Sequence, residues 1–489
     1  AIGEGGNLGV TQRGRIEYAQ AGGLIYTDSI DNSAGVNCSD KEVNIKILLS
    51  QLVKSGQLSS KERNQLLVEM TDEIAQKCLF NNYRQTQIID SIEQHAALNM
   101  YQHARFMRHL ETEKILNRRL EHLPSDKQIT DRIAKNQGLT HPELSILLSY
   151  SKLTYKNALL EASSLTEDCY DALLLGYFPR LIRKRYADEI RKHPLRKEII
   201  ATILSNEIAN NIGIGFGSRI REETGATIED IAKAYVVCVE VFDLYDTWRK
   251  LEKLDNVVHE NDRYDCFQAV SGLLERSISW LLRNQPADFS VSEVIARYKS
   301  DTKILRKVIS SVMVGQSRKN YLANKRRFVK YRLPKALAHE LVDKTTLAST
   351  FDIIEIKSKL HTDTEYVARL FFVLSERLQL HWIRDAISQT IVRTHWNHLA
   401  ILNLRNDLHA NQHNLTELVL QIVENKRHTN KAMSIWEEHN DIALQRYDSI
   451  LNEFSAMRSC DFPTISVAVS EVRRLVQLGK RIHARAEAI

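Results

Sequence analysis

The chain has 489 residues, which is too long for one hydrophobic core and indicates about two to four domains. Its 43% hydrophobic and 26% charged residues are typical of a globular protein, and only 18 Gly and 7 Pro favour long helices over turn-rich β-structure. The formal charge of +6 excludes a generally polybasic protein. No signal peptide or membrane span is visible, and six cysteines without a CxxC pair predict a reduced, cytoplasmic protein.

Two loops rich in glycine and asparagine lie in the first forty residues. Residues 4–11 read Glu-Gly-Gly-Asn-Leu-Gly-Val-Thr, and residues 31–39 read Asp-Asn-Ser-Ala-Gly-Val-Asn-Cys-Ser. Glycine lets the backbone approach a ligand closely, and an asparagine amide offers both a donor and an acceptor. At the carboxyl end of a strand, such loops can hold a ribose or a carboxamide. Each loop alone is equally typical of an ordinary turn.

Local signals place these loops at the edge of a sheet. A short helix over 12–21 precedes a β-like run at 24–26 and a turn-rich loop over 28–36. Ser39, with Glu42 three residues later, predicts the start of the next helix, where a carboxylate can bind. A chain that opens at a sheet edge indicates the end of an enzyme's catalytic domain. We therefore expect a truncated piece of a longer chain, or a natural split product.

After residue 50 the pattern is that of α-helices. Four capping signatures recur, in which a hydroxyl residue is followed three positions later by an acid or a glutamine: Ser59, Ser125, Thr140 and Thr227. Apolar spacing predicts these helical segments: 60–79, 83–116, 143–160, 227–251 and 364–391.

The predicted fold is mainly α. Residues 1–55 are expected to be a short remnant of the α/β dinucleotide-binding domain, at the end of a catalytic domain. Residues 56–489 are expected to form a large all-α extension in one or two lobes, and two lobes would be divided by a break near 284–334.

The two loops together resemble the end of the catalytic domain in glutamate dehydrogenases. Their sequences are most similar to those of the very large bacterial NAD-specific members. Two motifs carry this resemblance: Gly-Asn-Leu-Gly-x-Thr-Gln-Arg-Gly-Arg-Ile-Glu-Tyr-Ala from residue 6, and Asp-Asn-Ser-Ala-Gly-Val-Asn-Cys-Ser-Asp from residue 31. Later stretches are similar to the C-terminal region of that family, and they begin at Leu139, Ile199, Glu223 and Arg377. The resemblance therefore covers most of the chain.

The resemblance implies oxidative deamination of L-glutamate to 2-oxoglutarate and ammonia, with hydride passing to NAD. The residues that it places against NAD are Gly5, Gly6, Asn7 and Asn32. It places Ser39 on a carboxylate of glutamate and Val36 in the side-chain pocket. The reactive lysine and aspartate of the family have no counterpart here, so no catalytic residue is assigned. We expect an inactive isolated chain, completed by the upstream catalytic domains in a homo-oligomer.

Other features have plainer explanations. The Gly-Ile-Gly-Phe-Gly run at 213–217 lacks GxGxxG spacing and a preceding strand, so a kink or a close helix crossing is favoured over a nucleotide loop. The pairs His395/His398 and His409/His413 have helical spacing that could present metal ligands, but we assign no metal. Residues 318–335 are basic with interleaved aromatic residues, which leaves one alternative: an independent helical interaction module that binds nucleic acid.

Overall fold

The structure is a computed structural model that describes residues 1–390, 395–422, 429–457 and 461–487. It divides into two compact units: residues 1–238 with 260–292 form unit 1, and residues 239–259 with 293–489 form unit 2. The mainly α prediction is confirmed, since the described ranges contain helices and no strand. None of the unit boundaries lies near residue 55, so the assignment of residues 1–55 to a catalytic domain stays a prediction.

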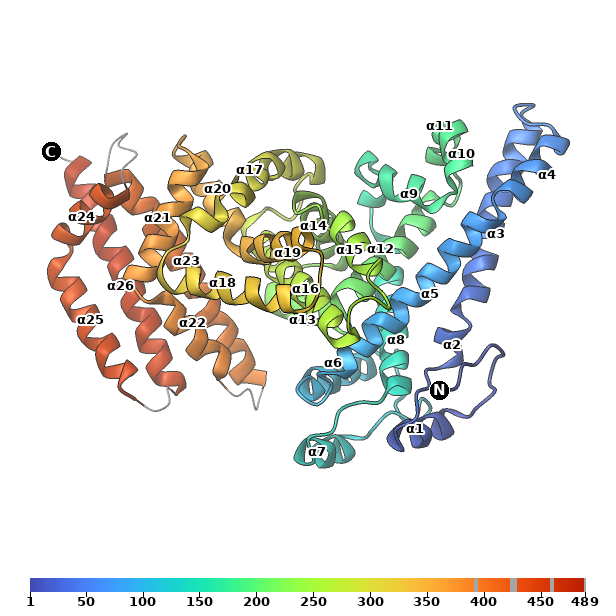
Figure 1. Cartoon of the computed structure of the whole chain (residues 1–489), viewed down its shortest axis with the longest axis horizontal. Helices are drawn as coiled ribbons and strands as arrows, with labels where there is room; N and C mark the ends of the chain where they lie inside the picture. Colours follow the sequence, from blue (N-terminus) through green and yellow to red (C-terminus); the bar gives the residue numbers. More distant parts are fainter. Residues whose placement is uncertain (391–394, 423–428, 458–460, 488–489) are drawn as a thin grey trace. The chain divides into compact units, whose positions relative to one another are not determined.

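Unit 1 contains the N-terminal loops and the helices of residues 1–238 and 260–292 (Figure 1). Its helices are α1 (Gln12–Gln20), α2 (Asp28–Asp31), α3 (Ser33–Lys54), α4 (Ser60–Glu69), α5 (Thr71–Glu93), α6 (Met100–Thr112), α7 (Asp126–Ala134), α8 (His141–Glu161), η1 (Ser164–Thr166), η2 (Asp168–Tyr170), α9 (Asp171–Tyr177), α10 (Arg180–Arg185), α11 (Ala187–Arg191), α12 (Arg196–Ile212), α13 (Phe216–Thr224), the first part of α14 (Ile228–Val241), and α16 (Glu260–Asn284). The long helices α3 and α5 pack side by side, and α8 packs against α1, α5 and α12.

Unit 2 contains the remaining helices. Among them, α23 and α26 pack along each other. The helices of unit 2 are α15 (Leu244–Glu252), α17 (Val291–Val312), α18 (Gly315–Lys330), α19 (Lys335–Thr346), η3 (Leu347–Ser349), α20 (Thr350–Lys359), α21 (Thr364–Arg377), α22 (Leu380–Gln389), α23 (His395–Ile422), α24 (Thr429–His439), α25 (Asp441–Ser455) and α26 (Phe462–Glu487). No helix in the described part of the chain has both the length and the apolar character needed to cross a bilayer.

The four predicted helix starts are confirmed by reciprocal bonds between side chain and backbone. At the start of α4, the Glu62 N–H donates to Ser59 Oγ at 3.2 Å, and the Ser59 N–H donates to Glu62 Oε2 at 2.9 Å. Each pair satisfies backbone donors that the first turn of a helix would leave unbonded. The same reciprocal arrangement begins α7, α8 and α14.

The sequence prediction is wrong between residues 24 and 42. Residues 24–26 form no strand. Among the described residues, this run has a single backbone hydrogen bond, in which the Ile2 N–H donates to the Leu24 carbonyl oxygen at 2.8 Å. The expected loop over 28–36 is instead α2 followed directly by the first turn of α3. Ser39 therefore lies inside α3 and does not cap a helix.

Three long predicted helices are interrupted. The segment 83–116 is broken at residues 94–99, between α5 and α6. The segments 227–251 and 364–391 are each broken by a residue in the left-handed conformation, Asp243 with φ 55° and Gln379 with φ 47°. Ile391, the last residue of the third segment, lies outside the described residues. Apolar spacing continues across these breaks, so periodicity alone could not locate them.

The glycine run at 213–217 is a helix junction, as expected. Gly213 and Gly215 have φ values of 112° and 72°, which place the turn between α12 and α13 in a region that favours glycine. Gly217 packs directly against Tyr155 of α8: its N–H donates to the phenol oxygen at 2.7 Å. A Cβ atom at this position would lie 2.4 Å from Tyr155 Cε1.

We expect Gly217→Ala to lower the free energy of unfolding by about 2 kcal/mol, because the added methyl group must displace the buried Tyr155 ring. Gly176→Ala is the matched control, since a Cβ at Gly176 in α9 meets nothing within 4 Å. That control should gain about 0.5 kcal/mol from higher helix propensity. Denaturant unfolding of both variants measures the difference, and equal midpoints would contradict the close packing.

Candidate functional site

The structure brings the two predicted loops together in unit 1. The Asn32 side-chain amide donates to Asn7 Oδ1 at 3.3 Å. The Glu4 N–H donates to Asp31 Oδ2 and the Leu8 N–H donates to Asp28 Oδ2, both at 2.9 Å. The loop of residues 4–9 is therefore fixed at both ends to α2, with Asn7 between the two attachment points.

The backbone of the first loop is open to solvent. Gly5, Gly6 and Asn7 are exposed, and Cβ atoms at Gly5 and Gly6 would meet nothing within 4 Å. Leu8 has φ 56° and a side chain that is 80% exposed. This loop can accept a ligand at its outer surface without displacing protein atoms.

A buried ion pair lies beneath this loop. Arg15 of α1 donates from Nε to Glu4 Oε1 at 2.9 Å, and its Nη2 contacts Glu4 Oε2 and lies 3.4 Å from Asp28 Oδ1. The hydrogen bonds with Glu4 raise the pKa of Arg15 above its ordinary value. Asp31, attached to the same loop, has a raised pKa because burial disfavours its charged form.

The N-terminus of α3 is positioned by amide side chains of α5. Ser33 Oγ accepts from Asn82 Nδ2 at 2.9 Å and from Gln85 Nε2 at 3.0 Å. Gly35 leaves room for the Asn32 side chain, because a Cβ at residue 35 would lie 2.7 Å from Asn32 Oδ1. Asn32 is consequently folded over the first turn of α3, facing Asn7.

The two predicted substrate residues lie on one exposed face of α3. Asn32, Val36 and Ser39 are spaced i, i+4 and i+7, which places them in line along a helix. Val36 is 72% exposed and Ser39 is exposed. The predicted cofactor and substrate residues thus form one continuous surface from the 4–9 loop along α3.

The sequence pattern missed the residues that hold this surface in place: Glu4, Arg15, Asp28 and Asp31. Their side chains fix the loops from within, and no spacing rule pairs Glu4 with an arginine eleven residues away. The sequence held no signal for this contact, because the burial of Arg15 beside Ile16 in a short helix is visible only in the folded structure.

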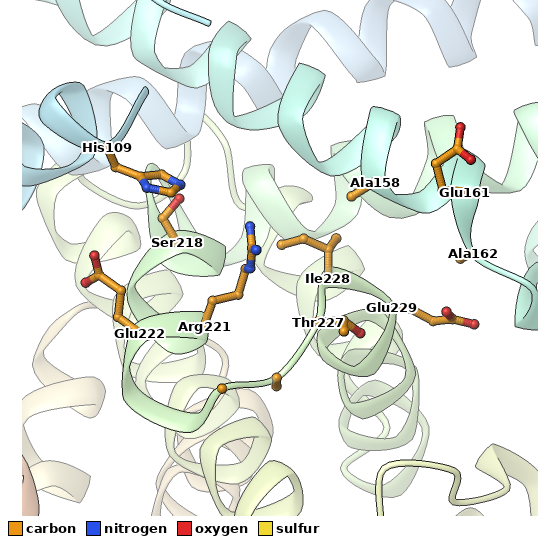
Figure 2. Close-up of a pocket in the computed structure, with 12 residues that line it drawn as sticks. His109, Ala158, Glu161, Ala162, Ser218, Arg221, Glu222, Thr227, Ile228 and Glu229 are labelled. Carbon is orange, nitrogen blue, oxygen red and sulfur yellow. The ribbon is translucent and has the colours of Figure 1, made fainter. Parts of the chain in front are cut away.

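A separate hollow of about 520 Å³ lies elsewhere in unit 1 (Figure 2). Its lining comes from α6, α8, α13 and α14, with His109 and Ser218 drawn close together and Glu161 and Glu229 on the opposite side of the view. Glu229 Oε1 is already occupied, because it accepts from the Ser164 N–H at 2.8 Å. The lining shares no residue with the predicted cofactor and substrate surface.

Two of the three aromatic residues in the basic segment 318–335 of unit 2, Tyr321 and Phe328, are buried. The Tyr321 phenol donates to Asp343 Oδ1 at 2.7 Å, and Phe328 is fully buried. Base stacking needs exposed aromatic faces. The structure therefore gives no support to the alternative of a nucleic-acid-binding module.

One histidine of the predicted pairs, His413, has a partner within the protein. His413 Nδ1 lies 3.0 Å from Asp352 Oδ1, which accounts for one of its ring nitrogens. The side chain of His395 lies outside the described residues. Within the described ranges, no three His, Cys, Asp or Glu side chains gather as a metal site would require.

Comparison with known proteins identifies related sequences over both units. The family model described as glutamate dehydrogenase, C-terminal, matches residues 136–474. The model described as bacterial NAD-glutamate dehydrogenase, catalytic domain, matches residues 1–92, which include all six predicted site residues.

Three curated relatives are each named NAD-specific glutamate dehydrogenase. Those of Halomonas elongata and Pseudomonas aeruginosa are 36% and 34% identical to this chain over 476 residues, which is 97% of the chain. The relative from Mycobacterium tuberculosis is 35% identical over 480 residues, or 98% of the chain. The match covers 29% of each relative, so the chain spans less than a third of their length.

Proposed function

The chain belongs to the glutamate dehydrogenase family, and we propose that it is the C-terminal part of an NAD-dependent glutamate dehydrogenase. The complete enzyme would convert L-glutamate and NAD to 2-oxoglutarate, ammonia and NADH. The observation that carries this proposal is the catalytic-domain match over residues 1–92. The meeting of Asn7 and Asn32 supports it, because it places two amides beside an open glycine loop.

In this proposal, the first forty residues complete the cofactor and substrate site. Gly5 and Gly6 allow NAD to approach the backbone, and the amides of Asn7 and Asn32 bind it by hydrogen bonds. Ser39 donates to a carboxylate of glutamate, and Val36 contacts its side chain. NAD supplies the hydride acceptor, while these residues bind and orient. The acid and base of the reaction would come from outside residues 1–489.

The purified chain is therefore expected to form no NADH from glutamate and NAD, whereas the complete dehydrogenase forms it. Absorbance at 340 nm measures both. Turnover by the chain alone would contradict the assignment of the acid and base to another part of the enzyme. Absence of turnover by the complete enzyme would contradict the proposed reaction.

In the complete dehydrogenase, Ser39→Ala is expected to raise the KM for glutamate by about tenfold or more, because it removes a hydrogen bond to a carboxylate. Ser50→Ala removes an exposed hydroxyl from the same helix and serves as the control. Steady-state kinetics at saturating NAD give the comparison. Equal KM values for glutamate in the two variants would remove Ser39 from the substrate site.

The helical remainder would pack on the catalytic core and contribute to a homo-oligomer in the cytoplasm. Its surface beside Val36 and Ser39 would face the upstream catalytic domains, which must supply the other wall of the site. Sedimentation of the complete enzyme tests the assembly, since a monomer with full activity would contradict it.

A further inference from the structure

We propose that Arg15 is a positioning residue for the cofactor site: its buried guanidinium sets the loop of residues 4–9 in register with the start of α3. This inference rests on the proposed function, because it takes Asn7 and Asn32 as the residues that face NAD. It adds a residue from α1, which lies behind the loop and offers no atom to the cofactor.

The burial of Arg15 separates it from any ligand. The Arg15 and Glu4 side chains are only 4% and 3% exposed, and they form a two-point contact through Nε and Nη2. The remaining amino group donates to Gln12 Oε1 at 3.2 Å, within the same helix. All three guanidinium nitrogens are thus engaged by protein, so Arg15 acts on a ligand only through the groups it holds.

Those groups control the loop at both ends. Glu4 begins the loop, and its N–H is bound by Asp31 at 2.9 Å. Asp28 lies 3.4 Å from Arg15 Nη2 and also accepts the Leu8 N–H at 2.9 Å. Arg15 therefore contacts both Glu4, at the start of the loop, and Asp28, which binds the Leu8 N–H, and Asn7 lies between these two points.

The backbone conformation of Leu8 requires the restraint that Asp28 and Arg15 provide. Its φ of 56° is a conformation that leucine rarely adopts without support from neighbouring groups. Without Arg15, Asp28 would face the buried Glu4 carboxylate uncompensated, and repulsion would favour release of the Leu8 N–H. The backbone at residue 8 could then relax, and Asn7 would move away from Asn32.

The two-point contact predicts a graded response to substitution. Lysine keeps the positive charge but cannot bond both Glu4 oxygens in the fork geometry of a guanidinium. Arg15→Lys should therefore weaken the restraint, and Arg15→Met should remove it. Asp28→Asn should act like Arg15→Met, because it weakens the acceptor for the Leu8 N–H.

The test is steady-state kinetics of the complete dehydrogenase with NAD varied at saturating glutamate. We expect the KM for NAD to rise about tenfold in Arg15→Met and about threefold in Arg15→Lys, with a smaller change in kcat. Combining Arg15→Met with Asp28→Asn should add little, because both act on the same restraint. Arg13→Met is the control: Arg13 lies on the same helix, is 78% exposed and pairs with Glu17.

The outcomes separate this inference from the proposed function. Wild-type enzyme that forms no NADH from glutamate would overturn the proposed function itself. An active wild type, with a KM for NAD in Arg15→Met equal to that of Arg13→Met, would overturn the positioning role alone. A loss of kcat in Arg15→Lys without any change in KM would do the same, because it would report only a loss of folded enzyme.

Discussion

Glu143→Ala is expected to lower the free energy of unfolding by about 3–5 kcal/mol, the largest effect of any single substitution considered. Glu143 is buried at the start of α8, where its Oε2 accepts from the Thr140 N–H at 2.8 Å and from the Thr140 hydroxyl at 2.9 Å. The same carboxylate binds Arg132 of α7 at two points, 2.8 and 2.9 Å. Its removal leaves a largely buried guanidinium unpaired and a helix start uncapped.

Glu62→Ala separates these two contributions. Glu62 makes the same capping contacts with Ser59 at the start of α4, but it is exposed. Its replacement should cost only about 1 kcal/mol, which is the usual value of a cap. Denaturant unfolding followed by far-ultraviolet circular dichroism measures both variants. Similar losses in the two would mean that the Arg132 contact contributes nothing beyond capping.

Lys152→Met is expected to flatten the pH dependence of stability between pH 7 and 9. The Lys152 ammonium donates to Gln85 Oε1 at 2.8 Å, and burial lowers its pKa to about 7, with nearby Arg84 acting in the same direction. In the unfolded chain the pKa is the ordinary 10.5. Between these values the unfolded state binds more protons, so the free energy of unfolding rises with pH.

The lysine should contribute as much as about 2 kcal/mol of this rise between pH 7 and 9. Urea unfolding of wild type and Lys152→Met at both values isolates that contribution, because the other titrating groups are common to both proteins. Parallel curves for wild type and Lys152→Met would contradict the buried environment of the Lys152 amine.

Features that depend on local chemistry were predictable from the sequence. Ser59, Ser125, Thr140 and Thr227 each begin a helix as expected, because a cap involves only four consecutive residues. The breaks at Asp243 and Gln379 were not predictable, since a single left-handed residue leaves the apolar spacing on both sides intact. Their positions depend on how the neighbouring helices pack.

Within the candidate site, the start of α3 also could not be predicted from local sequence. Asn-Ser-Ala-Gly at residues 32–35 is typical of a loop, yet it forms the first turn because Asn82 and Gln85 bind Ser33 from α5. Those partners lie about fifty positions away in the chain, so only the folded structure reveals them. The family resemblance implied that Asn7 and Asn32 face the same ligand, but neither their mutual hydrogen bond nor the Glu4–Arg15 contact beneath it could be predicted.

The central claim is that residues 4–39 form part of the NAD and glutamate site. Amide hydrogen exchange of the complete dehydrogenase, with and without saturating NAD and glutamate, tests it most directly. We predict slower exchange in peptides covering residues 4–9 and 31–39, and unchanged exchange in residues 318–335. Unchanged exchange throughout residues 4–39, in enzyme shown to be saturated with both ligands, would contradict the account.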